Sequence, residues 1–384
     1  MTGSPAKGMQ VRALAVVIAS VAIMGITYGL TMPLMSLRLE ARGIDSGLIG
    51  LNAAMAALGV VLMPPLIPML LRQVGVRPFL LLNLVGTGMA LLGLALTDWL
   101  PAWFVLRLIL GACLAGLFVV SEAWINHLAD DRSRGRVLGI YSSVLAAGFT
   151  IGPLLLQVTG VEGVLPFLAG LGFLAVAAIP LSLVGGEDPP LSGHPSRGVL
   201  GFAAAAPIAS SAALVFGAIE AGVLSLLPVY GVRSGLTPEG AAAMAAAIGL
   251  GNFAMQVPLG WLADRTNVRW MLVACALAGL AGAVALPFTV DTVLLWPVLF
   301  MAGGAMMGIY TLGLTLLGQR FRGPDLAAAN GAFVVMYGLG ALGGPALTGA
   351  AMDAIVPHGL PLVLGTFCLG FAVLATVRTL RGQN

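Results

Sequence analysis

Three charged residues stand inside long apolar stretches of the chain, where a charge is costly and tends to mark a pathway through a membrane. The first is Glu220, which has no other charged residue within ten positions on either side. A carboxyl group in apolar surroundings is costly to ionise, so it can take up and release protons near neutral pH. The alternative is a glutamate that stays protonated and only packs.

The other two charges, Arg107 and Glu122, fall on one expected helix. They are 15 residues apart (122 − 107), roughly 22 Å along a helix, so they cannot pair with each other. For Arg107 the structural alternative is an arginine that bonds helix ends near one surface. Glu122 can equally form an ion pair with Arg134 or Arg136, at the start of the next apolar run, or serve transport.

The composition places the chain in a lipid bilayer. Of its 384 residues, 59% are hydrophobic and 9% are charged, whereas about 25% are charged in a soluble domain. Cys113, Cys275 and Cys368 lie in apolar stretches and show no disulfide or metal-binding spacing, so we expect no metal and no cofactor. The net charge of +3 is too small to indicate a nucleic-acid partner.

Twelve apolar runs are long enough to span a bilayer as helices, which takes about 20 residues each. They are 11–36, 46–70, 77–97, 100–125, 137–159, 164–184, 199–228, 239–262, 269–290, 292–318, 326–350 and 358–379. We therefore expect an all-α membrane protein with a six-helix bundle over 1–184, a linker over 185–198 and a second bundle over 199–384. The first run lacks a short apolar core with a cleavage site, so we expect it to be retained as a span.

Basic residues are distributed unevenly between the two ends of these helices. If the N-terminus is cytoplasmic, fourteen Lys and Arg residues lie inside and three, Arg38, Arg42 and Arg233, lie outside. Cytoplasmic loops are enriched in basic residues. We expect a multi-pass protein of the cell (inner) membrane with both termini in the cytoplasm.

Two sequence patterns recur at an offset of 192 residues, half the chain length. One is a short polar turn at 260–269, whose counterpart is 68–77. The other, Gly-x8-Gly-x3-Gly-Pro, occurs at Gly139, Gly148, Gly152 and Pro153 and again at Gly331, Gly340, Gly344 and Pro345. Two weak patterns at one shared offset indicate a duplication with both halves in the same direction. We expect each proline to bend a helix that the glycines make deformable.

The turn at 260–269 resembles the loop signature of the major facilitator superfamily, Gly-x-Leu-Ala-Asp-Arg-x-Gly-Arg-Lys. Asp264 and Arg265 match it, and Asn267 stands where the pattern has Gly. Asparagine is the next residue most tolerant of a left-handed backbone. In the first half, Arg72 replaces the acid. The resemblance implies a twelve-helix transporter built from two halves in a parallel repeat.

Three further segments resemble the same superfamily. Residues 107–111 resemble its fourth-helix Arg-x-x-x-Gly signature, which implies that Arg107 faces the central cavity and takes part in proton or substrate handling. The Gly-Pro pattern of the fifth helix resembles an antiporter signature, with Leu155 and Leu156 in place of its closing Gly-Gly, and implies efflux. Residues 122–139 resemble a poorly characterised bacterial branch of the superfamily, which names no substrate.

Helices that this fold places around a central cavity carry uncharged polar residues, among them Thr27, Tyr28, Tyr310 and Thr311. Tyr28 is the counterpart of Glu220 at the 192-residue offset, so the two halves present different chemistry at one depth. The alternative for such residues is hydrogen bonding between helices.

Two more pairings follow from helix geometry. Asn252 and Gln256 are four positions apart on the eighth helix and share a face. Glu220 and Arg107 are each expected roughly 10–15 Å from the outer surface, in opposite halves. Domain motion would alternately bring them together and separate them, which would couple a proton to transport.

The rest of the expected cavity is apolar and rich in methionine, which suits an amphiphilic organic solute better than a sugar or a phosphate. We expect a monomeric secondary transporter that moves such a small-molecule substrate by proton-coupled efflux. Uptake symport and facilitated diffusion are the alternatives, and a non-transporting scaffold or receptor would not need the central polar residues. No enzyme is expected, because nucleotide loops, metal spacings and nucleophile–base arrangements are missing from the sequence.

A gate is expected at the cytoplasmic helix ends. In this superfamily the eighth helix borders the fifth and the second borders the eleventh, so Asp264 should face the start of the fifth helix and Arg72 should face Asp325. The alternative is that Asp325 only caps its own helix. The residues of this expected gate are Asp264, Arg265, Arg134, Arg136, Glu122, Arg72 and Asp325.

The gate can be tested by labelling a cysteine introduced into the cavity from the cytoplasmic side. Asp264→Asn should increase labelling several-fold, because a partly exposed ion pair contributes about 1 kcal/mol or less. Arg72→Asp should do the same, and adding Asp325→Arg should restore the original rate. No change in the first variant, or no rescue in the second, would contradict the pair concerned.

Overall fold

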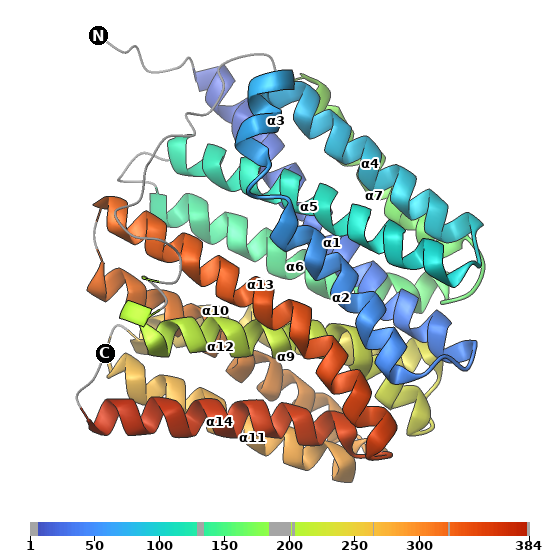
Figure 1. Ribbon diagram of the computed structural model, residues 1–384, viewed down its shortest axis with the longest axis vertical. Helices are drawn as coiled ribbons and strands as arrows, with labels where there is room; N and C mark the ends of the chain where they lie inside the picture. Colours follow the sequence, from blue (N-terminus) through green and yellow to red (C-terminus); the bar gives the residue numbers. More distant parts are fainter. Residues whose placement is uncertain are drawn as a thin grey trace. The chain divides into compact units, whose positions relative to one another are not determined.

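The computed structural model describes residues 7–128, 134–183, 201, 204–263, 265–321 and 323–381. Within these ranges the chain forms helices joined by short turns, and no strand (Figure 1). The helices are α1 (Lys7–Ala41), α2 (Ser46–Leu62), α3 (Ile67–Val74), α4 (Val76–Leu96), α5 (Leu100–Leu128), α6 (Arg134–Thr159), α7 (Leu165–Leu183), α9 (Pro207–Arg233), α10 (Pro238–Ala263), α11 (Val268–Thr289), α12 (Leu295–Arg320), α13 (Gly323–Ala354) and α14 (Gly359–Leu380).

The helices α2 and α3 form one bent pair. When this pair is counted as one segment, the described helices correspond to the twelve helical segments that the sequence predicts. The pair turns by 64° at a break over residues 63–66, which contains Pro64 and Pro65. Proline lacks the N–H that a helix needs and its ring clashes with the preceding turn. The expectation of one continuous helix over 46–70 is therefore wrong. The segment expected near 199–228 contains α9, which begins at Pro207, a favoured first residue, and the chain is also helical at 201 and 204–205.

The length and surface of the helices are those of a membrane protein. Within the described ranges, nine helices are long and apolar enough to cross a membrane, or ten if the bent pair counts as one span. The helices α6 and α7 contribute shorter apolar stretches, Ser143–Thr159 and Leu165–Ile179. Large apolar side chains stay exposed on one face of α4, where Leu82 and Val85 are each 61% exposed. Such a face is suited to contact with lipid.

The described helices pack into two compact units. Unit 1 holds the part of α1 up to Thr31 and the chain from Leu58 through α7, and unit 2 holds Met32–Ala57 and α9 to α14. The last ten residues of α1 (Met32–Ala41) and most of α2 therefore pack with the C-terminal helices. The predicted linker at 185–198 lies outside the described residues, and the domain boundary stays a prediction.

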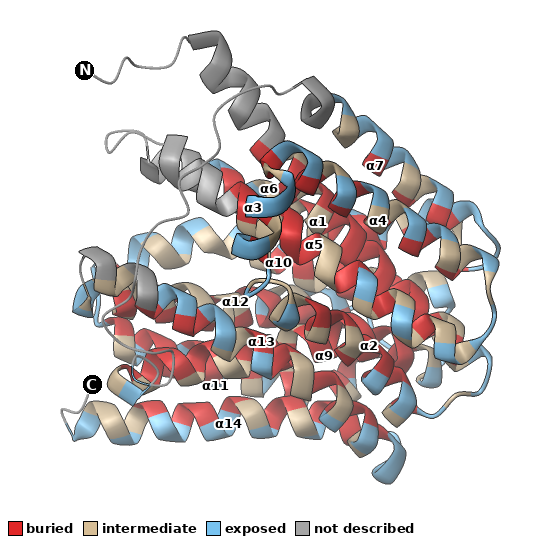
Figure 2. Ribbon diagram, turned by 45° about the horizontal axis from the view of Figure 1, so that its top comes forward, coloured by how far each residue is buried: buried red, intermediate tan, exposed pale blue. Residues whose placement is uncertain are grey.

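Helix α9 is the central element of unit 2. It packs against α10, α12, α13 and α14. In the most apolar stretch of the helix 83% of the residues are buried, the highest share among the candidate spans. Figure 2 shows buried residues along its length. Small residues such as Ala213, Gly217 and Ala221 allow this, because neighbouring backbones can approach closely. A polar side chain on α9 is consequently held by its neighbours.

The predicted duplication is confirmed in the packing of the helices. A Cβ atom on Gly25 of α1 would lie 2.6 Å from the carbonyl oxygen of Leu145 on α6. A Cβ atom on Gly217 of α9 would collide with the carbonyl oxygen of Tyr337 on α13. Both residues of the first pair precede those of the second by 192 positions (217 − 25 and 337 − 145). The same crossing, with glycine at the contact, is thus built twice.

The glycines of the Gly-x8-Gly-x3-Gly-Pro pattern mostly lie at these crossings. Gly148 and Gly152 press on the backbone of α1, and Gly340 and Gly344 press on that of α9. A Cβ on Gly331 would meet open space, and of Gly139 only the helical backbone is described. Helices α6 and α13 continue through Pro153 and Pro345. Close approach is therefore the visible role of the pattern, and bending stays a prediction.

Asn267 does not adopt the left-handed backbone that the loop signature indicated. Its φ is −75° and ψ is 111°, which is extended, and its side-chain oxygen accepts a hydrogen bond from the N–H of Arg269. Asparagine thus serves as the N-cap of α11, a position that it favours. Its counterpart Gly75 does adopt a positive φ of 77°. The two halves enter the following helix by different turns, so the left-handed interpretation of Asn267 is wrong.

The crossing of α9 with α13 can be tested by adding volume at Gly340. Gly340→Leu should lower the midpoint of thermal unfolding by several degrees, because overpacking a close contact costs about 1–3 kcal/mol. The control is Gly343→Leu, since a Cβ there would meet nothing within 4 Å. Equal midpoints for the two variants, measured in detergent with a thiol-reactive dye, would contradict a packing role for Gly340.

Candidate functional site

Glu220 lies at the middle of α9 and forms a hydrogen bond to another helix. The phenol of Tyr337, on α13, donates to its Oε2 atom at 2.7 Å. Both side chains are partly buried. The carboxyl group therefore has one defined partner and is otherwise set in apolar surroundings, where its charge is costly. A group of this kind can exchange a proton with whatever reaches it.

The pair meets because of the helix crossing at Gly217. With no side chain at that position, α13 approaches until the carbonyl oxygen of Tyr337 occupies the space of a Cβ. Glu220 follows Gly217 by three residues, which places it on a neighbouring face of α9. The same glycine that sets the distance between the helices thus brings the phenol within reach of the carboxyl group.

Aromatic rings from three helices surround this pair. Phe216 of α9 lies 5.0 Å from Tyr310 of α12 and 6.0 Å from Tyr337, measured between ring centroids. Phe333 of α13 contacts Tyr310 edge-on at 5.1 Å. We call Phe216, Tyr310, Phe333 and Tyr337 the aromatic cluster. Phe216 and Phe333 are buried, so Tyr310 and Tyr337 are the rings of the cluster whose faces remain partly exposed. Aromatic faces of this kind attract apolar and cationic groups.

Arg107 lies in unit 1, on α5, and is only 1% exposed. Its guanidinium donates a hydrogen bond to the carbonyl oxygen of Thr31 on α1 at 3.3 Å. Tyr28 also lies on α1, and its ring contacts Phe149 of α6. Thr27 is buried beside it. These contacts tie α5 to α1 inside the helix, since Thr31 lies ten residues before the end of α1. They are structural contacts, but they are not the bonds to helix ends that the sequence alternative supposed. The coupling of Arg107 to Glu220 stays a prediction.

The remaining predicted cavity residues lie on α10 and α12. Gln256 donates to the side-chain oxygen of Asn252 at 3.2 Å, so the prediction that they share a face is confirmed. Thr311 is partly buried, and its carbonyl oxygen accepts a hydrogen bond from Thr315. Whether a substrate contacts these residues stays a prediction.

The expected cytoplasmic gate is only partly described. Asp264 lies outside the described residues, as do the side chains of Glu122, Arg134 and Arg136. Arg265 stacks on the ring of Trp261, with its guanidinium carbon 3.8 Å from the centroid.

The other two gate residues are both described. Arg72 is exposed on α3, and Asp325 lies in the first turn of α13. They belong to different units. The predicted pairs therefore stay predictions.

A charged cluster that the sequence analysis did not predict lies at the helix ends around the α1–α2 turn. Arg233, the last residue of α9, donates two hydrogen bonds to Glu40 of α1, at 2.7 and 2.8 Å. Asp353 of α13 lies 3.9 Å from the same guanidinium. Its carboxylate also accepts from the N–H groups of Ser46 and Gly47, at 2.9 and 2.7 Å. We call Glu40, Arg233 and Asp353 the Arg233 cluster.

The Arg233 cluster closes a tightly packed contact between α2 and α13. A Cβ on Gly50 would collide with the carbonyl of Pro345, and one on Gly349 with the carbonyl of Ser46. Asp353 caps the free N–H groups at the start of α2, where a negative charge also meets the positive end of the helix dipole. The end of the helices with the α1–α2 turn is therefore held by charge and packing together.

The sequence analysis did not predict Tyr337, Phe216, Glu40 or Asp353 as site residues, for identifiable reasons. Tyr337 is one of only five tyrosines and lies three residues before Gly340, so its rarity in an apolar helix was an available signal. Phe216 precedes Glu220 by one helical turn and shares its face. Glu40 and Asp353 are ordinary acids at helix ends, and nothing in their spacing indicates a common partner. Within the described ranges, no three His, Cys, Asp or Glu side chains gather as metal ligands.

Comparisons with known proteins agree with this architecture. A family model described as Major Facilitator Superfamily matches residues 17–312 and 212–382. The uncharacterized MFS-type transporter YfkF of Bacillus subtilis (strain 168) is 26% identical over 357 residues, which cover 88% of each chain.

Solved structures share the fold at lower identity. A bacterial homolog to the human lysosomal transporter Spinster, in an inward-facing and occupied conformation, has a TM-score of 0.79 at 16% identity, covering 99% of both chains. The nucleoside transporter NupG has a TM-score of 0.76 at 15% identity, covering 98% of this chain and 99% of its own. Identities this low support the fold alone.

The Arg233 cluster can be tested by labelling a buried position behind it. Ser225 of α9 is fully buried and contacts Met32, so a cysteine placed there should react slowly with an impermeant maleimide when Cys113, Cys275 and Cys368 are replaced. Asp353→Asn should raise the rate several-fold, because capping and ion-pair contacts are each worth about 1 kcal/mol.

The matched control is Asp291→Asn, which removes an exposed acid from the turn between α11 and α12. It should leave the rate unchanged. An equal increase in both variants, or none in either, would contradict a specific role for Asp353.

Proposed function

Because this chain belongs to the major facilitator superfamily, whose members are transporters and not enzymes, we propose that it moves a small amphiphilic organic solute across the membrane by alternating access. The observation that carries the proposal is the hydrogen-bonded pair of Glu220 and Tyr337 within the membrane-spanning part of α9 and α13. A carboxyl group is retained there at a cost, which favours a role in transport over one in packing alone.

Proton coupling is supported by the surroundings of Glu220. The neutral carboxyl is compatible with apolar neighbours, whereas the charged form needs a hydrogen-bond donor or a cation. Tyr337 is one such donor, and a cationic group of a substrate or Arg107 in another conformation would be a second. A proton and a cationic group then compete for the carboxyl of Glu220, so that the protein can exchange one for the other across the membrane.

The substrate class follows from the aromatic cluster. Tyr310 and Tyr337 are the partly exposed rings of the cluster, whereas Phe216 and Phe333 are buried. The described polar groups beside them are few: the carboxyl of Glu220 and the phenols of Tyr310 and Tyr337. A sugar or a phosphate would need many more donors and acceptors. A compact amphiphile with an apolar body and one polar or cationic group satisfies the cluster.

Direction and topology belong to the same proposal. The excess of basic residues supports cytoplasmic termini in the inner membrane, which makes the end with the α1–α2 turn the outer one. The Arg233 cluster would then hold the outer end closed and would separate when that end opens. We propose proton-coupled efflux by a monomer, since one chain contains both halves of the repeat.

The proposal is tested in proteoliposomes with an imposed pH gradient. A panel of amphiphilic fluorescent dyes, with nucleosides as polar comparators, identifies a compound that the wild-type protein moves. Glu220→Gln should reduce gradient-driven flux of that compound at least tenfold and remove its dependence on pH, because an amide cannot carry the proton. Tyr337→Phe should reduce flux several-fold, since the carboxyl loses its donor.

Glu162→Gln is the matched control, because Glu162 is exposed in the turn between α6 and α7. Its flux should equal that of the wild type. Full gradient-driven flux in Glu220→Gln would refute proton coupling through this carboxyl group.

A further inference from the structure

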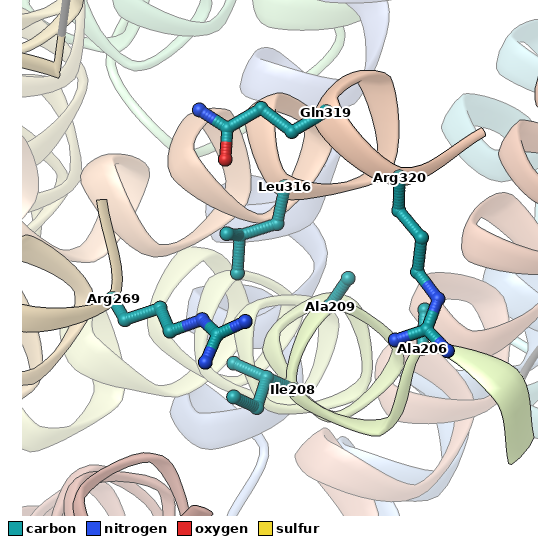
Figure 3. A pocket seen from close by; sticks show the side chains of 7 residues that line it. All are labelled: Ala206, Ile208, Ala209, Arg269, Leu316, Gln319 and Arg320. Carbon is teal, nitrogen blue, oxygen red and sulfur yellow. The ribbon is translucent and has the colours of Figure 1, made fainter. Parts of the chain in front are cut away.

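A pocket of about 210 Å³ opens at the end of unit 2 that is opposite to the Arg233 cluster. It lies between the first turn of α9, the start of α11 and the last turn of α12 (Figure 3). Glu220, in the middle of α9, is about eleven residues from this turn, or roughly 16 Å along the helix. The pocket is therefore separate from the proposed transport site.

The charged groups of the pocket are cationic. Arg269 reaches it from α11 and Arg320 from α12, and the side-chain amide of Gln319 lies beside them. Among the described residues that line it, none carries a carboxylate. In the described part of the chain neither guanidinium forms an ion pair, and Arg320 lies 5.8 Å from the ring centroid of Phe321. Two such groups at one pocket repel each other and attract an anion.

The walls between the two arginines are apolar. Ile208 and Ala209 of α9 are almost fully buried, and Leu316 of α12 covers the opposite side. Pro207 and the N-cap residue Ala206 offer no side chain to cap α9, so the positive end of its dipole adds to the two charges. A ligand that satisfies this pocket needs one compact anion joined to an apolar body.

We propose that this pocket binds the phosphate group of an anionic phospholipid. It lies where three membrane-spanning helices begin or end, which is the depth of lipid headgroups. Guanidinium groups match phosphate oxygens with paired hydrogen bonds, which favours phosphate over other anions. The volume is below the roughly 300–1,000 Å³ of whole small-molecule sites, so it suits a headgroup whose acyl chains stay in the bilayer.

Occupation of the pocket has a consequence for the fold. Ile208 belongs to the same apolar core as Phe216, and Leu316, Tyr310 and Tyr337 pack against that core. A lipid that bridges Arg269 and Arg320 would hold the ends of α11 and α12 against α9. Binding should therefore stabilise unit 2 against heat, independently of any transport activity.

The test is native mass spectrometry of the full-length protein in detergent, with titrated phosphatidylglycerol, phosphatidylcholine, oleate or inorganic phosphate. The wild type should retain phosphatidylglycerol about tenfold more tightly than phosphatidylcholine. The double variant Arg269→Gln, Arg320→Gln should lose that preference. Its thermal midpoint should no longer rise with phosphatidylglycerol.

The control is the double variant Arg378→Gln, Arg381→Gln, which removes the same charge at the end of α14, outside the pocket. It should keep the preference. If the first double variant does not fold, Arg320→Gln alone, at an exposed side chain, should weaken phosphatidylglycerol about threefold.

Four outcomes would overturn the proposal. They are unchanged retention in the pocket variants, equal loss in the α14 control, oleate binding as tightly as phosphatidylglycerol, and inorganic phosphate that binds as tightly as the lipid. The third would assign the pocket to carboxylates and the fourth to a soluble phosphate.

Discussion

Close approach of helix backbones is the constraint on which the rest of this structure depends. In a bilayer, lipid tails are as apolar as leucine, so helices gain little from burying apolar side chains against each other. They gain from dense packing, and glycine at a crossing makes that possible. At Gly217 the carbonyl of Tyr337 fills the space of a missing side chain. The hydrogen bond from Tyr337 to Glu220, the aromatic cluster and the burial of α9 all follow from that contact.

The two halves of the chain share this packing and differ in their chemistry. Gly25 with Leu145 and Gly217 with Tyr337 are the same crossing, separated by 192 positions. At the position of Glu220, however, the first half has Tyr28, whose ring packs on Phe149. In the place of Tyr337 the first half has Leu145. A repeat can thus keep the contacts that hold helices together while only one copy retains an ionisable pair.

Much of the fold could be predicted from the sequence, because each span is encoded locally by a run of apolar residues and the duplication by recurring glycines. Local exceptions also have local causes. Pro64 and Pro65 break the second span, and Asn267 caps α11 with an extended backbone. The site was harder, since its contacts join distant positions. Tyr337 and Glu220 are 117 residues apart, and Ser46 and Asp353 are 307 apart. Spacing within one helix did predict the contact of Asn252 with Gln256, but hydropathy and spacing carry no signal for which polar residues of different helices face each other.

The Arg233 cluster also makes the molecule responsive to its medium. The side chains of Arg233 and Glu40 are 28% and 17% exposed, so dissolved ions reach their ion pair, and at 0.15 M salt such charges are screened over about 8 Å. Asp353 is 35% exposed as well, but its bonds from Ser46 and Gly47 join one charge to neutral N–H groups. Screening weakens such a contact less than an attraction between two charges. As salinity rises, the arginine contact loses strength first and the cap on α2 persists. The balance of forces at this end of the helices therefore shifts with the ionic strength of the compartment that it faces.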